Sequence, residues 1–229
     1  MKALSRRQFL YISAFFSFTC PLSIAAVFSE ENKLKKDHGF PITMDVLKDA
    51  CLSEMAAHKH YFAYSKKAVF EGYPNIACLF SALAVSEKIH ANNYERILGS
   101  LGASHEKSKL KIVISGTQAN LKKAAEKELD KIKKTYPNFL AKLEKESHDQ
   151  AVINCMYSWK SHRQHEEKIN EIIMYSDIFF GSMAKEIEGM KLDFHVCEIC
   201  GATIDESPQT PCDICNYPVY HYQKVNPPI

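Results

Sequence analysis

Residues 79–101 read LFSALAVSEKIHANNYERILGSL. Large apolar residues and ionisable residues recur here every three or four positions, which is the period of a single helix face. The residues on that face are Leu79, Leu83, Glu87, His90, Tyr94, Ile97 and Leu101. Because Glu87 and His90 are three positions apart, a helix presents them side by side to whatever covers the face. The stretch predicts a buried helix that carries candidate metal ligands.

Three further segments between residues 42 and 188 show the same period, and glycine and proline are scarce there. One ends before Gly72, and its inner face consists of Leu47, Cys51, Glu54, Tyr61, Ser65 and Ala68. Another runs from about Gln118 into a kink at Tyr136-Pro137. The last begins near Asp149, and its inner face consists of Cys155, Ser158, His162, His165, Ile169 and Ile172. We therefore expect an all-α four-helix bundle over residues 40–188.

Residues 102–116 form a connection that is long for two neighbouring helices. Its run Ile112-Val113-Ile114 predicts a short extended strand. The length of the connection indicates a crossover between two halves of the bundle.

The two halves repeat one another. Glu54 precedes Glu87 by 33 residues, and Glu128 precedes His162 by 34. The six candidate ligands are Glu54, Glu87, His90, Glu128, His162 and His165. A single Glu or His at a helix interface is more often simply hydrogen-bonded, but three unneutralised buried carboxylates are costly and a pair of metal ions neutralises them. The repeat therefore predicts a buried di-metal site of the ferritin-like kind.

Residues 194–229 contain two CxxC turns, 11 residues apart, whose cysteines are Cys197, Cys200, Cys212 and Cys215. Each turn directs two thiolates at one ion, and Gly201 lets the backbone fold beneath the second sulfur. Two disulfides are the alternative in an oxidising compartment. The spacing favours a four-sulfur metal knuckle but does not choose between iron and zinc. We expect it to fold largely independently of the helices, beyond a linker at residues 185–193.

Three stretches of the helical region resemble rubrerythrin: Ser53-Glu54 with Tyr61, Lys66 to Tyr73, and Val85 to Ala91. Glu128 followed by Tyr136-Pro137 is similar to the second half of that family, and the tail resembles rubredoxin. The resemblance implies a non-haem di-iron peroxidase, active against oxidative stress, that reduces hydrogen peroxide with electrons relayed by a rubredoxin-like iron. It also implies a homodimer in which one chain's rubredoxin-like iron approaches the other chain's di-iron site. The electron donor is left unidentified.

Carried over residue by residue, the resemblance places five residues on iron ligands of the family, and two positions depart from its pattern. The five are Glu54, Glu87, His90, Glu128 and His165. His162 stands where the family has a bridging Glu, and Lys131 stands where it has a further Glu one turn after Glu128. Both departures put the peroxidase competence in question. They favour the alternative function, a non-catalytic ferritin-like protein that binds metal or transfers electrons at a degenerate di-metal site.

Weaker candidates surround this set. Tyr61 and Tyr136 are candidates to hydrogen-bond metal-bound oxygen species, although packing explains them equally well. His58 lies one turn beyond Glu54 and is a candidate substitute ligand. Three further cysteines read as small buried hydrophobic residues: Cys51, Cys78 and Cys155.

Residues 1–28 have the order of an export leader. Ser5-Arg6-Arg7-Gln8-Phe9-Leu10 begins a run with no further charge until Glu30, and small residues precede a cleavage position after Ala25. The paired arginines resemble the Tat leader, which exports folded proteins. An uncleaved membrane anchor is the alternative. Either reading places the folded part outside the cytoplasm, in the periplasm or at the outer face of the inner membrane.

The charge balance excludes a polyanion-binding function. The formal net charge of +2 falls to −1 without Lys2, Arg6 and Arg7. A nucleic-acid backbone therefore meets no basic field on the remainder, and we expect no nucleic-acid partner.

The leader hypothesis predicts that Arg6→Lys combined with Arg7→Lys leaves the protein in the cytoplasm, because the paired arginines are the export signal. Cell fractionation and immunoblotting measure this. The matched control is Lys2→Arg, which should be exported as before. Normal export of the double variant would rule out the Tat assignment.

Overall fold

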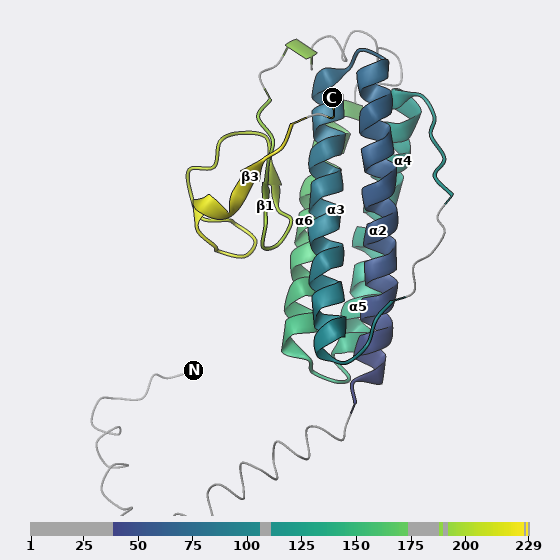
Figure 1. Cartoon of the computed structure of the whole chain (residues 1–229), viewed down its shortest axis with the longest axis vertical. Helices are drawn as coiled ribbons and strands as arrows, with labels where there is room; N and C mark the ends of the chain where they lie inside the picture. The colour runs from purple at the N-terminus through teal and green to yellow at the C-terminus, as the bar shows by residue number, and fades with distance from the viewer. Residues whose placement is uncertain (1–38, 106–110, 174–187, 190–191, 227, 229) are drawn as a thin grey trace, which may run out of the picture. The chain divides into compact units, whose positions relative to one another are not determined.

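The computed structural model describes residues 39–105, 111–173, 188–189, 192–226 and 228. The proposed leader, residues 1–28, lies outside the described residues. The helical elements are α2 (Pro41–Phe70), α3 (Pro74–Ser100), α4 (Thr117–Asp130), the π-helical η1 (Lys131–Thr135), α5 (Tyr136–Leu143) and α6 (Asp149–Ile173). The C-terminal elements are β1 (His195–Cys197), β2 (Thr203–Ile204), the 3-10 helix η2 (Val219–His221) and β3 (Tyr222–Lys224). Figure 1 shows α2 and α3 side by side, with α4, α5 and α6 behind them.

The tight turn between α2 and α3 makes these two helices antiparallel neighbours. Gly72 has φ +82°, a left-handed conformation that only glycine adopts readily. Pro74 then begins α3, where its missing N–H costs no helical hydrogen bond. The Glu71 carboxylate accepts a hydrogen bond from the Thr117 backbone N–H over 2.7 Å, which ties the start of α4 to the same turn.

The segment before α4 departs from the sequence prediction. Residues 111–116 form no strand, and Ile112, Val113 and Ile114 are 39–51% exposed. The strand prediction was wrong because an extended run needs an open backbone edge to pair with, whereas the segment passes helices whose backbone groups are already bonded. The chain still crosses between the two halves of the bundle here, as predicted.

The third helix also differs, since it passes through Pro137 and continues to Leu143. Pro137 has no N–H for the carbonyl four residues earlier, and the Tyr136 N–H reaches back five residues to the Lys131 carbonyl. The helix therefore widens into a π-turn at Lys131–Thr135, one turn before the predicted kink. Glu128, Lys131 and Tyr136 are all buried.

Two apolar clusters fill the bundle above and below the polar residues of α3. One contains Tyr61, Phe80 and Leu83, and the other contains Leu47 and Tyr94. Burying one such side chain contributes about 1.5–3 kcal/mol. The clusters fix the inner faces of the helices, and the residues between them are held inward whatever their polarity.

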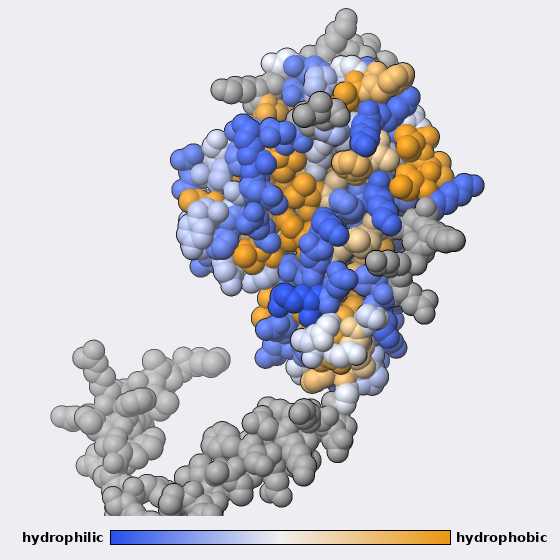
Figure 2. Space-filling model, viewed as in Figure 1, coloured by the Kyte–Doolittle hydropathy of each residue, from blue (hydrophilic) through white to orange (hydrophobic). Residues whose placement is uncertain are grey.

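The C-terminal knuckle is a three-stranded antiparallel sheet in the order β2-β1-β3. Its residues Phe194, Val196 and Val225 belong to the same buried cluster as Leu79 and Leu83 of α3. In Figure 2 hydrophobic residues gather along the seam between the knuckle and the helices. We expected the knuckle to fold largely independently of the helices and did not foresee this shared core. The apolar residues that flank the CxxC turns do not indicate in the sequence which element they pack against.

None of the helices in the described part of the chain is both long and apolar enough to cross a membrane.

The shared core predicts that Phe194→Ala lowers the unfolding free energy of the helices by about 3–5 kcal/mol. The substitution would leave a cavity between the knuckle and α3. Urea unfolding followed by far-ultraviolet circular dichroism measures the effect. Tyr220→Ala is the matched control, since Tyr220 is 76% exposed. An unchanged helical transition in Phe194→Ala would mean that the knuckle adds nothing to the stability of the bundle.

Candidate metal centre

All six predicted ligands meet in the middle of the bundle. Glu54 comes from α2, Glu87 and His90 from α3, Glu128 from α4, and His162 and His165 from α6. Each residue is at most 1% exposed. They form two overlapping ligand sets, each with its ligand atoms within 4.8 Å of one another. The first set is Glu54, Glu87, His90 and His162, and the second is Glu87, Glu128, His162 and His165.

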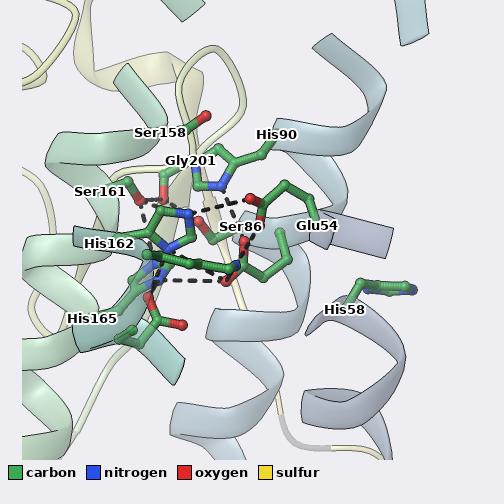
Figure 3. A network of polar contacts seen from close by, with 12 residues as sticks. Glu54, His58, Ser86, His90, Ser158, Ser161, His162, His165 and Gly201 are labelled. Atoms are coloured by element: carbon green, nitrogen blue, oxygen red, sulfur yellow. Dashed lines mark hydrogen bonds and ion pairs between the residues drawn. The ribbon is translucent and has the colours of Figure 1, made fainter. Parts of the chain in front are cut away.

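His162 stands between the two sets (Figure 3). Its Nδ1 lies 2.6 Å from Glu128 Oε2, and its Nε2 lies 3.5 Å from Glu54 Oε1. The Nε2 atom has no hydrogen-bond partner. The imidazole therefore lies between Glu128 and Glu54, with Nδ1 toward Glu128 and Nε2 toward Glu54.

His165 has the surroundings of a metal ligand. Its Nε2 lies 3.3 Å from the hydroxyls of Ser161 and Thr203, which orient the ring. Its Nδ1 has no hydrogen-bond partner and lies 3.5 Å from Glu128 Oε2 and 3.9 Å from Glu87 Oε1. A buried nitrogen with no partner is costly, and a metal ion between these atoms would satisfy it.

Lys131 points into the cluster. Its Nζ donates to Glu54 Oε2 over 2.5 Å and to Glu87 Oε1 over 3.2 Å, and the residue is 6% exposed. Sequence comparison with the family marked this position as a departure but did not settle where the side chain points. The three-residue spacing from Glu128 was the available signal, since both then share a face.

The charges of the cluster are strongly coupled. Burial raises the pKa of Glu54, but Lys131 and His162 outweigh it and hold that pKa well below its usual range. Burial and the nearby Glu54 raise the pKa of Glu87 well above its usual range, despite Lys131. Burial works against the charge on Lys131, yet Glu54 and Glu87 raise its pKa above the ordinary value. The Lys131 ammonium and the Glu54 carboxylate therefore stabilise each other's charge.

Two tyrosines hold the carboxylates in place. Tyr61 donates its hydroxyl to Glu128, and Tyr136 donates to Glu54 Oε1 over 2.7 Å. Both candidates are therefore at the site. His58 is not, since its Nδ1 lies 2.7 Å from the Ala84 carbonyl oxygen and Figure 3 shows it apart from the cluster.

The knuckle touches the cluster through His90. The His90 Nε2 donates to the Cys200 carbonyl over 3.1 Å. Ser86 and Ser161 donate their hydroxyls to the Gly201 carbonyl over 2.7 and 2.9 Å. Sequence reasoning missed both serines, although each directly precedes a ligand, Glu87 or His162, at equivalent positions of the repeat.

The four knuckle sulfurs have the separation of metal ligands. Sγ atoms of Cys197 and Cys215 are 3.7 Å apart, and those of Cys200 and Cys212 are 3.5 Å apart. A disulfide requires about 2.05 Å. Sulfurs at about 2.3 Å from a tetrahedrally bound ion lie about 3.8 Å apart, so the geometry fits one ion and not two disulfides. The other three described cysteines are free and buried, as predicted: Cys51, Cys78 and Cys155.

A four-helix bundle with a carboxylate and histidine di-metal site, joined to a four-cysteine knuckle, defines a ferritin-like metalloprotein with a rubredoxin-like domain. The Rubrerythrin family model matches residues 45–173, and the chain belongs to the rubrerythrin family, whose members are di-iron oxidoreductases. This confirms the resemblance, the fold class and iron as the cofactor type.

Named relatives agree with this family. Rubrerythrin-2 of Clostridium acetobutylicum is 29% identical over 179 residues, covering 76% of this chain and 91% of that protein. Nigerythrin of Nitratidesulfovibrio vulgaris is 29% identical over 177 residues, covering 77% and 83%. A structure of fully reduced, all-ferrous nigerythrin is 27% identical, has a TM-score of 0.68 and covers 80% of this chain and 86% of that one.

The contact at Gly201 predicts a specific sensitivity. Gly201 has φ +79°, and a Cβ there would collide with the His90 ring and lie 2.7 Å from Ser86 Oγ. Gly201→Ala should therefore destabilise the protein by about 1–3 kcal/mol. Gly99→Ala is the control, because a Cβ at Gly99 meets nothing within 4 Å. Chemical unfolding measures both, and equal stability of the two variants would contradict the close approach.

Proposed function

We propose that the protein reduces hydrogen peroxide to water at the buried cluster. One peroxide molecule takes up two electrons and two protons, its O–O bond breaks, and two water molecules form. The observation that carries the proposal is the hydrogen bond from His90 to the Cys200 carbonyl, which joins a cluster ligand to the knuckle. Iron in the two sites would supply the electrons for this cleavage and their replacement one at a time.

A cavity supports access of a small substrate. It has a volume of about 380 Å³ and lies between α2, α4 and the crossover segment, against Tyr61, Val113, Lys127 and Lys131. Hydrogen peroxide is far smaller than this cavity. The cavity walls include two groups of the cluster itself, Tyr61 and Lys131, so a peroxide molecule that entered here would arrive beside the carboxylates.

Tyrosine hydroxyls hold protons beside the carboxylates of the cluster. The Tyr61 and Tyr136 hydroxyls donate to Glu128 and Glu54, and burial holds the pKa of both tyrosines well above the usual range, so both keep their protons. Tyr94 extends the chain by donating to Ser158 over 2.8 Å, with its oxygen 3.2 Å from that of Tyr136. These hydroxyls hold protons within reach of the site where water forms.

The alternative function is a non-catalytic metal-binding or electron-transfer protein. Lys131 and His162 favour it, because both replace a carboxylate of the family pattern with a group that adds no negative charge. Zinc in one or both sites would produce such a protein.

The surroundings of the protein are part of the proposal. We propose that the Tat-like leader exports the folded chain to the periplasm, or holds it at the outer face of the inner membrane. The electron donor is unidentified, and the family resemblance favours a homodimer. The knuckle contacts the cluster of its own chain, so delivery of electrons to the cluster does not require the knuckle of a second chain.

The proposal predicts that hydrogen peroxide oxidises the anaerobically reduced protein with one peroxide consumed per two electrons. Stopped-flow absorbance at the thiolate-to-iron bands and metal analysis measure this. A protein that contains zinc, or whose reduced iron is oxidised by peroxide no faster than free ferrous iron, would favour the non-catalytic alternative.

Cys197→Ser tests whether electrons reach the cluster through the knuckle. It should abolish the thiolate-to-iron bands and stop turnover with an external donor, because one of the four sulfurs is lost. Cys78→Ser is the matched control, since Cys78 is buried outside both metal sites and bonds the Val225 carbonyl through its thiol. Sustained turnover by Cys197→Ser would show that electrons bypass the knuckle.

A further inference from the structure

The two halves of the cluster differ in what remains unsatisfied. In the half around Glu54, Oε1 accepts from Tyr136 and Oε2 accepts from Lys131. His90 has a partner at each ring nitrogen, since Nδ1 lies 3.2 Å from Glu87 Oε2 and Nε2 donates to the Cys200 carbonyl. This half is closed by groups of the chain itself, apart from the Nε2 of His162.

The half around Glu128 has a ring nitrogen that is oriented and unsatisfied, as in a metal-binding site. His165 has its Nε2 held by the two hydroxyls and its Nδ1 unpartnered, with Glu128 and Glu87 oxygens nearby. Fixing one ring nitrogen so that the other is free is how proteins orient a metal-binding histidine. Lys131 makes no hydrogen bond with Glu128, whose oxygens face Tyr61 and His162.

The charge balance of the cluster agrees with this asymmetry. Metal binding requires ionised carboxylates, so Glu54, Glu87 and Glu128 then contribute three negative charges, and the Lys131 ammonium contributes one positive charge. One divalent ion would then bring the buried site to neutrality with neutral imidazoles. A second divalent ion would leave two uncompensated positive charges and would lie against the ammonium, which the low-dielectric interior penalises.

We propose that Lys131 makes the two metal positions unequal. Glu87, Glu128, His162 and His165 bind one divalent metal tightly, and the Lys131 ammonium holds the Glu54 half in place of a tightly bound second metal. A second ion enters only when Lys131 withdraws. With one iron in the cluster and one in the knuckle, the chain still stores the two electrons that a peroxide requires. The loading order itself does not depend on the proposed reaction.

Cobalt(II) titration of the metal-free full-length protein tests the inference. Thiolate charge-transfer bands report the knuckle, weaker ligand-field bands report the cluster, and elemental analysis after gel filtration gives the total. The wild type should retain about two cobalt ions per chain, one in each site. Lys131→Gln and Lys131→Glu should retain about three, with the second cluster ion bound at least about tenfold more tightly.

The control is Lys134→Gln. Lys134 lies in the same π-turn, but its side chain is 79% exposed and pairs with Asp130, so its loss should leave the wild-type count. Two equally tight ions in the wild-type cluster, or an unchanged count in both Lys131 variants, would overturn the inference.

A second pair of variants identifies the tight half without touching Lys131. His165→Gln should weaken the first cluster ion about 10- to 100-fold, and His90→Gln should weaken it much less. The reverse order would assign the tight ion to the Glu54 half and overturn the inference.

Electron paramagnetic resonance of the iron-loaded, oxidised wild type tests the inference without a variant. An isolated high-spin ferric signal from the cluster is expected, and a coupled pair at full occupancy would contradict it.

Discussion

Neutralisation of three carboxylates in a dry helical interior is the constraint on which the rest of the structure depends. Glu54, Glu87 and Glu128 are each fully buried. Such charges persist only where cations or directed hydrogen bonds surround them. The helices supply these from every side, with tyrosine hydroxyls from α2 and α5, imidazoles from α3 and α6, and the ammonium of Lys131. The apolar clusters above and below then keep water away from the arrangement.

The knuckle is part of this arrangement as well as a second metal site. Its Gly201 carbonyl accepts from two serines that neighbour ligands, and its Cys200 carbonyl fixes one nitrogen of His90. Phe194 and Val225 complete the apolar cluster on the same side of α3. The two sites are therefore connected through hydrogen bonds and packing, and the orientation of His90 depends on the knuckle being seated.

The parts of the fold that follow from periodicity were predictable from sequence. Spacing placed Glu87 and His90 on one face and identified all six residues that meet in the cluster, because a helix repeats regularly and a buried polar residue stands out against apolar neighbours. The CxxC turns were also identifiable from the sequence, because two thiolates of one turn that bind the same ion need a fixed spacing. The strand prediction for Ile112–Ile114 was wrong, because β-propensity does not indicate whether another strand offers an edge to pair with.

Contacts between distant segments were not predictable in the same way. Nothing local to Gly201 indicates that a histidine ring lies against it, and its left-handed φ has an independent reason in the CxxC turn. The spacing from Glu128 placed Lys131 on the same face, but it did not show that the ammonium reaches Glu54 and Glu87. Both features are decided by tertiary packing, which a single sequence pattern does not encode.

The π-turn at Lys131–Thr135 also determines how this part of the chain can vary in evolution. Lys133 and Lys134 are exposed, so many side chains are tolerated there. Lys131 is buried against the carboxylates and is not free to vary in the same way. A π-turn holds one residue more than an α-turn, so the helix after it keeps the phase of the helix before it. A relative that lacks one residue here should wind as a plain α-helix and still present Tyr136, Phe139 and Leu143 to the interior. A relative that lacks two residues should turn them away, because each further residue removed rotates the helix by about 100°.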